Sequence, residues 1–119
     1  MVDANIEARD ILKKFTAENP GYSLCYRSPG EKAKMPCIVY FNVTTMAGLG
    51  WDNEIASQKS AVQVSVFGVS PSENTGAVNK ICELFWNAGW GIVSITDIPP
   101  EEGTRIYQTA ARFRKNIYL

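Results

Sequence analysis

The amino-terminal segment has apolar residues with the spacing of one helix face. They lie at positions i, i+3, i+4 and i+7: Ala8, Ile11, Leu12 and Phe15. Asp3 or Asn5 can cap the start of this helix, and the Asn-Pro-Gly run at 19–21 ends it, because proline cannot continue the hydrogen-bond ladder. The pattern predicts a surface helix with one buried stripe.

Residues 70–89 have the strongest local helix signal of the chain. Ser70 and Glu73 have the spacing of a capping box with a proline between them, and Gly89 can end the helix. The apolar stripe again follows i, i+3, i+4 and i+7: Val78, Ile81, Cys82 and Phe85. We interpret Trp86 and Trp90 as packing residues, because aromatic side chains bury a large apolar area.

Five further segments alternate apolar and polar residues with the period of two that is typical of half-buried strands. We expect these strands over 22–26, 38–45, 56–68, 91–98 and 104–119. In the second of them, the alternation favours a row that faces the core: Val39, Phe41 and Val43. In the last, an apolar row alternates with a polar outer row: Gln108, Arg112 and Arg114.

This order of elements predicts an α+β fold in a single domain spanning residues 1–119. We expect a mostly antiparallel sheet of four to five strands, two helices packed on one face, and a protruding β-hairpin arm. Because polar residues alternate in each strand, the other face of the sheet is either solvated or covered by another subunit.

The arm is predicted where residues 46–53 interrupt the alternation between two strands. Two glycines and an Asp-Asn pair break any periodicity there, which favours an irregular connection. Leu49 and Trp51 lie in it, and exposed apolar side chains on a protruding arm are costly for a soluble monomer. Tryptophan is also a favoured interface anchor. We predict that the arm contacts another subunit; the alternative is that it folds back on its own domain.

Charge and composition exclude several classes of chemistry. The 119 residues contain 12 Lys+Arg and 12 Asp+Glu, and this neutral balance argues against a stand-alone nucleic-acid binder. Histidine is absent from the sequence, which removes histidine-based catalysis and histidine-ligated zinc. We interpret the three widely spaced cysteines as reduced apolar residues: Cys25, Cys37 and Cys82.

The remaining charged and glycine-rich motifs favour no reaction. The acidic pairs Asp52/Glu54 and Glu101/Glu102 lie in predicted loops, and the glycines at 48 and 50 lack the spacing of a phosphate loop. One basic cluster occurs near the carboxyl end: Arg105, Arg112, Arg114 and Lys115. It could contact phosphates or an acidic partner, although a solvated or salt-bridged sheet face is the preferred interpretation. We expect no enzyme, cofactor or metal, and no targeting or membrane-spanning segment.

Several stretches resemble small tail-completion or tail-terminator proteins of long-tailed bacteriophages and prophages. Residues 36–43, Pro-Cys-Ile-Val-Tyr-Phe-Asn-Val, resemble the "P-x-[IV]-x-Y" strand of that family, and the glycine-rich stretch ending at 52–56 resembles its hairpin arm. Residues 62–67 are similar to the second hairpin strand, and 105–114 to the last strand with its Arg-Phe-Arg-like end. The resemblance runs from residue 22 to the carboxyl terminus and rests on pattern and order.

The resemblance implies a structural role in the virion tail, after assembly in the cytoplasm of the bacterial host. Such proteins form a ring, often a hexamer, at the head-proximal end of the tail tube; they stop tube polymerisation and join the tail to the head. The implied partners are further copies of the chain, the tail-tube protein and a head-completion or connector protein. DNA would pass through the ring without specific binding, and no membrane is involved.

The residues we expect at subunit or partner interfaces lie in the predicted arm and on the last strand: Leu49, Trp51, Asp52, Arg112 and Arg114. Two alternatives remain at this stage. One is another virion component of similar fold, such as a head–tail connector or tail-tube subunit. The other is a cytosolic α+β module that binds a small molecule or uses carboxylates for catalysis.

Overall fold

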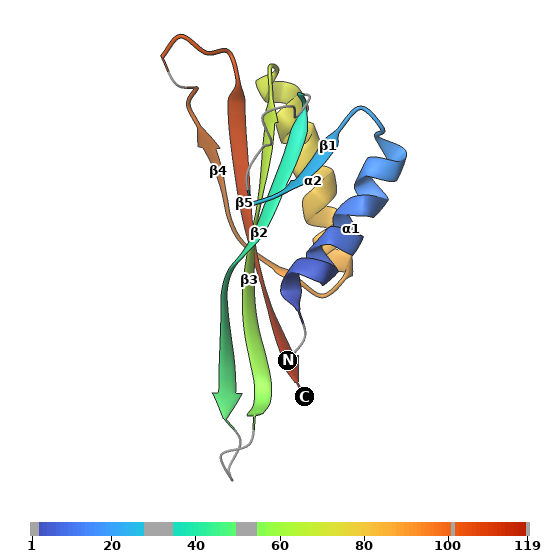
Figure 1. The fold of residues 1–119 in the computed structure, drawn as a ribbon, viewed down its shortest axis with the longest axis vertical. Coiled ribbons are helices and arrows are strands. Elements are labelled where there is room, and N and C mark those ends of the chain that lie inside the picture. Colours follow the sequence, from blue (N-terminus) through green and yellow to red (C-terminus); the bar gives the residue numbers. More distant parts are fainter. Residues whose placement is uncertain (1–2, 28–34, 50–54, 101, 119) are drawn as a thin grey trace.

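Two helices and a five-stranded sheet form the fold in the residues that the computed structural model describes, 3–27, 35–49, 55–100 and 102–118. The elements, in chain order, are α1 (Ala4–Glu18), β1 (Ser23–Tyr26), β2 (Cys37–Leu49), β3 (Ile55–Gly68), α2 (Pro71–Asn87), β4 (Gly91–Ile98) and β5 (Tyr107–Tyr118). The strand order is β1-β2-β3-β5-β4, with β1 parallel to β2 and every other pair antiparallel. Both helices lie on one face of the sheet (Figure 1). The predicted α+β fold is therefore confirmed.

Helix α1 begins and packs as its sequence predicts. Asp3 is the N-cap, and its Oδ1 accepts a hydrogen bond of 2.9 Å from the backbone N–H of Asn5. The predicted stripe is buried: Ala8, Ile11, Leu12 and Phe15. Helix α2 also has the cap and the end that its sequence predicts. Ser70 Oγ accepts a hydrogen bond from the Glu73 N–H, and Gly89 adopts a φ of +92° just after the helix.

One of the two tryptophans near the end of α2 departs from the prediction. Trp90 is buried and packs its ring edge-on against Phe85 at 5.7 Å, whereas Trp86 is 63% exposed. The interpretation of Trp86 as a packing residue is therefore wrong. Trp86 follows the last buried position of the helical stripe, and helical rotation turns it away from the sheet.

The core lies between the helices and the middle of the sheet. Strand β3 contributes Val62, Val64 and Val66, which are all essentially inaccessible to solvent. The neighbouring β5 adds Ala111 and Phe113, and the Phe113 ring stacks on Phe85 of α2 at a centroid distance of 4.2 Å. Burying each large apolar side chain contributes about 1.5–3 kcal/mol. This interface between α2, β3 and β5 is a main source of stability.

Strand β2 presents the opposite face to the core from the one predicted. Ile38 and Tyr40 belong to the core under the helices, whereas Val39 of the predicted row is buried on the other side of the strand. Val43, the last residue of that row, lies at a register shift with β3 and is 37% exposed. The beginning of β2 is apolar on both faces, so alternation alone could not choose between them. The pairing with β3 determines which face of β2 lies under the helices. Ile38 lies opposite Val66 and Tyr40 opposite Val64, and directly opposite residues share a face of the sheet.

Strand β2 is longer than expected, whereas β3 begins within one residue of its predicted start and ends as predicted. Residues 46–49, predicted as part of an irregular connection, continue β2 as far as Leu49, which pairs with Ile55. Glycine and alanine disfavour a strand, but the backbone pairing of residues 46–49 with β3 holds them in one here. Figure 1 shows this end of β2 and β3 extending well past both helices. The turn itself, with Trp51 and Asp52, lies outside the described residues.

A polar contact joins α1, the end of α2 and β5. Lys115 Nζ lies 2.6 Å from Glu7 Oε1 and donates a second hydrogen bond of 3.0 Å to the carbonyl of Ala88. The indole N–H of Trp90 also donates to Glu7 Oε1, at 3.2 Å. Lys115 therefore faces the helices, and its assignment to the basic cluster with Arg112 and Arg114 is wrong. Successive side chains of a strand point to opposite faces, so Lys115 lies on the other side of β5 from the two arginines.

Candidate interaction surface

The sheet face opposite the helices is available as an interaction surface, and we call it the open face. Strand alternation and the registers of β2, β3 and β5 place these accessible residues on it: Phe41, Gln63, Phe67, Gln108, Ala110, Arg112 and Arg114. Val39 and Ser65 lie on the same side of the sheet but are buried. No helix among the described residues covers this face (Figure 1). The accessible part of this face is therefore a candidate interaction surface.

Side-chain hydrogen bonds order the polar part of the open face. Arg112 Nη2 donates to Gln63 Oε1 at 3.0 Å, directly across the β3–β5 pair. Gln63 and Gln108 each donate to Ser65 Oγ, at 3.4 and 3.2 Å. These contacts, two of them between β3 and β5, hold the amides and the guanidinium in a defined arrangement before any partner arrives. Arg112 and Arg114 are exposed there, as the alternation predicts.

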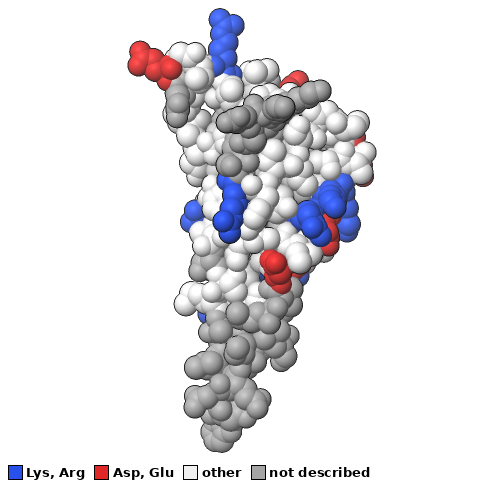
Figure 2. All heavy atoms as spheres, viewed as in Figure 1, with Lys and Arg blue, Asp and Glu red and all other residues white. Residues whose placement is uncertain are grey.

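Charges of both signs are mixed on the molecular surface. On the face drawn in Figure 2, Lys and Arg side chains stand close to Asp and Glu side chains, and uncharged atoms separate these groups. This distribution agrees with the formal net charge of zero. A single-sign region that would attract a polyanion is not visible on the drawn face.

The five residues expected at interfaces do not form one cluster in the structure. Arg112 and Arg114 lie two residues apart on one side of β5. Arg114 pairs with Ala61, which itself pairs with Thr44, so the arginines lie level with the middle of β2. Leu49 lies five residues farther along β2, roughly 17 Å at the rise of a strand. The side chains of Leu49, Trp51 and Asp52 are outside the described residues.

A second surface was missed by the sequence analysis. Strand β4 is the last strand of the sheet and exposes four large apolar residues, which we call the β4 edge: Ile92 (44% exposed), Val93 (51%), Ile95 (50%) and Ile98 (39%). Alternation of apolar and polar residues in this segment resembles that of a half-buried strand. In the structure β4 is the terminal strand and little packs on its faces, so these side chains are exposed.

The charged residue of β4 does not protect this edge. Thr109 Oγ1 donates a hydrogen bond of 2.8 Å to Asp97 Oδ1, so the carboxylate is engaged with the neighbouring strand β5. The sequence of β4, Gly-Ile-Val-Ser-Ile-Thr-Asp-Ile, contains neither lysine nor proline. Those are two of the devices with which proteins prevent association at a sheet edge; a third, a β-bulge, is present between Ile92 and Ser94.

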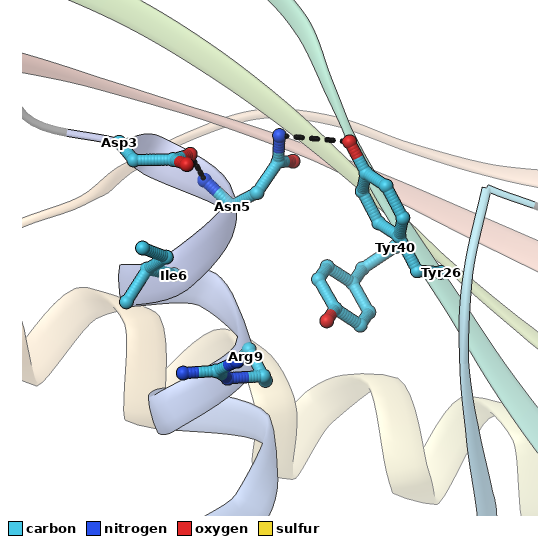
Figure 3. Close-up of a pocket in the computed structure, with 6 residues that line it drawn as sticks. All are labelled: Asp3, Asn5, Ile6, Arg9, Tyr26 and Tyr40. Atoms are coloured by element: carbon cyan, nitrogen blue, oxygen red, sulfur yellow. Dashed lines mark hydrogen bonds between the residues drawn. The ribbon is translucent and has the colours of Figure 1, made fainter.

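Two of the surface hollows lie next to strands of the sheet. The first, about 210 Å³, lies between the start of α1 and strands β1 and β2 (Figure 3). Asn5 Nδ2 donates to Tyr26 Oη at 3.0 Å across it, and Tyr26 packs against Tyr40. Burial raises the pKa of Tyr40 above its ordinary value. These polar groups chiefly fasten α1 to the sheet.

The second hollow is more apolar and measures about 300 Å³. Its lining comes from the segments around the ends of β3 and β4 and the start of β5: Met35, Phe67, Ile98, Pro99, Pro100, Thr104, Ile106 and Gln108. Phe67 and Gln108 belong to the open face, and Ile98 belongs to the β4 edge. The hollow therefore lies where these two surfaces meet.

The described residues offer little reactive chemistry. They contain no cluster of three or more Cys, Asp or Glu side chains able to hold a metal ion. The three cysteines are free thiols; burial, with a smaller contribution from Cys25, raises the pKa of Cys37 to about 11. Burial also raises the pKa of Cys82. Thiols held in this protonated form are poor nucleophiles at neutral pH.

No helix in the described part of the chain has the length and apolar character needed to span a membrane. No protein-family model matches the sequence, and no curated protein matches it either.

Proposed function

We propose that the protein is a tail-terminator subunit of a long-tailed bacteriophage or prophage. In this role, copies form a ring at the head-proximal end of the tail tube, stop its growth and join it to the head. The observation that supports this proposal best is the pairing of β2 with β3 out to Leu49 and Ile55, beyond the layer of helices. Strands that extend outside their own core provide contact surface for a neighbour.

The unlike surfaces of the molecule suit a ring. The described residues extend over 55 × 30 × 24 Å, with the paired β2–β3 ends at one end and the apolar hollow near the opposite ends of the same strands. Contacts between two unlike surfaces are heterologous, and they close into a ring when the rotation between subunits permits. Further copies, the tail-tube protein and a head-completion or connector protein are the proposed partners.

Arg112 and Arg114 are proposed to contact a neighbouring subunit or one of these partners. They are exposed, and the bond from Arg112 to Gln63 orients its guanidinium on the open face. A guanidinium in a fixed position suits recognition of a carboxylate on a partner. The neutral chain as a whole suits a ring through which DNA passes without being held.

Electron microscopy of a deletion phage tests the proposal. Removing the coding sequence should produce abnormally long tails, or heads and tails that do not join. Complementation with the native chain should restore normal particles. The double variant Leu49→Asp with Trp51→Asp should not, because it places charge in the predicted apolar contact.

A matched control is Val69→Asp, which changes an exposed apolar residue in the turn between β3 and α2. It should restore normal particles as the native chain does. Normal tail length and joining in the deletion phage would contradict the proposal. Complementation by the Leu49/Trp51 double variant would contradict the role assigned to the arm.

The apolar hollow favours a second candidate, a module that binds a small apolar molecule. Its volume of about 300 Å³ lies at the lower limit of ligand sites in proteins. A ligand screen that monitors thermal unfolding distinguishes the two functions. Binding at the hollow, abolished by Phe67→Asp, would support the module, while the deletion phage would then have normal tails.

A further inference from the structure

We propose that the open face binds an extended, acidic polypeptide segment through a row of three cations: Lys59, Arg112 and Arg114. This partner chemistry rests on the proposed function, in which the two arginines contact a neighbouring subunit or another tail protein. The charges of the sheet, the spacing of the three cations and a hollow beside Arg112 support it.

The sheet separates its charges by face. Asp97 is the one acidic residue in the five strands as the structure describes them, and it lies opposite the buried Thr109 on the helix side. Lys115 faces the helices as well. Lys59 is an even number of residues from Gln63 on β3, so it lies on the open face with the two arginines. The described charges of the open face are therefore all positive, although the chain as a whole is neutral.

No described carboxylate neutralises the three cations. Both ion pairs between described residues involve α1, on the other side of the sheet. Gln63 accepts a hydrogen bond from Arg112 Nη2, and a guanidinium has five N–H donors. The other donors can form charge-assisted hydrogen bonds with a carboxylate of a partner.

The spacing of the cations matches that of an extended peptide. Arg112 and Arg114 are two residues apart on β5, and Lys59 of β3 lies opposite Asn116, which is two residues farther along β5. Each of these steps is about 7 Å at the rise of a strand. Side chains on one side of an extended peptide repeat at about the same distance, so carboxylates at alternate residues can each reach one cation.

A hollow beside Arg112 offers neutral hydrogen-bond donors to the same segment. It measures about 220 Å³, and its lining includes Arg112, Ser94, Thr96, Ile98 and Ala110. The side chains of Ser94 and Thr96 are exposed, and their hydroxyl groups can donate to a carboxylate that the guanidinium holds. We expect one carboxylate of the segment to bind in this hollow.

The surroundings of the row favour a polypeptide over a nucleic acid. The residues directly across the β3–β5 pair from the cations are Gln63, Ala61 and Asn116, and none of them has an aromatic ring on which a base could stack. The neutral chain also lacks the basic excess on which affinity for nucleic acid depends.

Titration of the isotope-labelled protein with a synthetic peptide, followed by NMR, tests the proposal. A blocked peptide of alternating glutamate and serine should shift the backbone amide signals around the three cations and Ser94 at low ionic strength, and salt should weaken its binding. The same peptide with glutamine in place of glutamate should not bind. A peptide of equal composition with consecutive glutamates should bind about threefold more weakly or worse, because alternate residues face the sheet.

Variants of the protein identify the row as the binding site. The triple variant Lys59→Gln, Arg112→Gln and Arg114→Gln should raise the peptide Kd by about tenfold or more, because three charge-assisted contacts are lost. The matched control removes the same charge from exposed positions of the helices: Lys13→Gln, Lys14→Gln and Lys80→Gln. The control should bind as the native chain does. Circular dichroism verifies that both variants are folded.

Three results would overturn the proposal: no binding of the alternating peptide, an equal loss of affinity in both triple variants, or equal binding of the glutamine peptide. A single-stranded oligonucleotide that shifts the same amides at lower concentration than the peptide would also overturn it, in favour of nucleic acid as the ligand. None of these measurements involves ring assembly. Tail length and joining in the deletion phage therefore decide the tail-terminator function separately.

Discussion

Individual side chains decide how the helices are attached to the sheet. Lys115 and Glu7 are only about one-quarter exposed, and they connect the first helix to the last strand. The same carboxylate accepts the indole N–H of Trp90. One ion pair thus links three elements that are distant in the sequence, and the additional hydrogen bonds to Glu7 and from Lys115 offset the cost of removing both charges from water.

Replacing Lys115 with methionine should lower the free energy of unfolding by about 1–2 kcal/mol, because the apolar stem is retained while both hydrogen bonds are lost. Urea denaturation monitored by fluorescence measures the change. Lys80→Met, at an exposed position of α2, is the matched control and should change stability little. An equal effect of the two substitutions would show that the Glu7 contact contributes nothing.

Whole elements follow closely from local sequence signals where those signals are strong. Both helices have the predicted caps and buried stripes, because the helical period and the capping chemistry act within a few residues. Strand faces were less predictable. β2 is apolar on both sides at its start, and the choice of its inner face depends on its pairing with β3.

Two glycines of the α2 region should respond to alanine in opposite ways. Gly76 lies on the exposed side of the helix, with nothing within 4 Å of an added Cβ, so Gly76→Ala should stabilise by about 0.5–1 kcal/mol. Gly89 has a φ of +92°, where an L side chain is strained, so Gly89→Ala should destabilise by about 1 kcal/mol or more. Thermal unfolding of each variant should show shifts of opposite sign. Shifts of the same sign would refute this account of the helix end.

At the scale of the whole molecule, burial links stability to alkaline pH. The thiol of Cys37 ionises at an ordinary pKa of 9.0 when unfolded and at about 11 in the folded chain. Between these values the unfolded chain has released a proton that the folded chain keeps. Unfolding is therefore favoured as the pH rises through this range, and the stability present below pH 9 declines. Burial raises the pKa of Cys82, Tyr22 and Tyr40 in the same direction.

The free energy of unfolding should therefore fall by on the order of 2 kcal/mol from Cys37 alone across that interval. Guanidinium titrations at a series of pH values measure the decline. Cys37→Ala should make the decline of the unfolding free energy with pH shallower, because the variant lacks this titrating thiol. Val39→Ala, which shortens a buried neighbour that does not titrate, should lower stability at every pH and keep the slope. An unchanged slope in Cys37→Ala would contradict the assigned cause.

The sequence by itself determined the two helices, the approximate strand positions, the α+β class and the polar outer row with Arg112 and Arg114. Those features depend on periodicity and capping, which act between residues close in the chain. Only the tertiary structure decided which face of β2 is buried, that Lys115 contacts Glu7, and that β4 lies at the sheet edge. These depend on the strand order β1-β2-β3-β5-β4 and on contacts between residues as much as 108 positions apart. An alternating strand has the same sequence pattern in the centre of a sheet as at its edge, and only its neighbours determine whether Ile95 is buried or exposed to water.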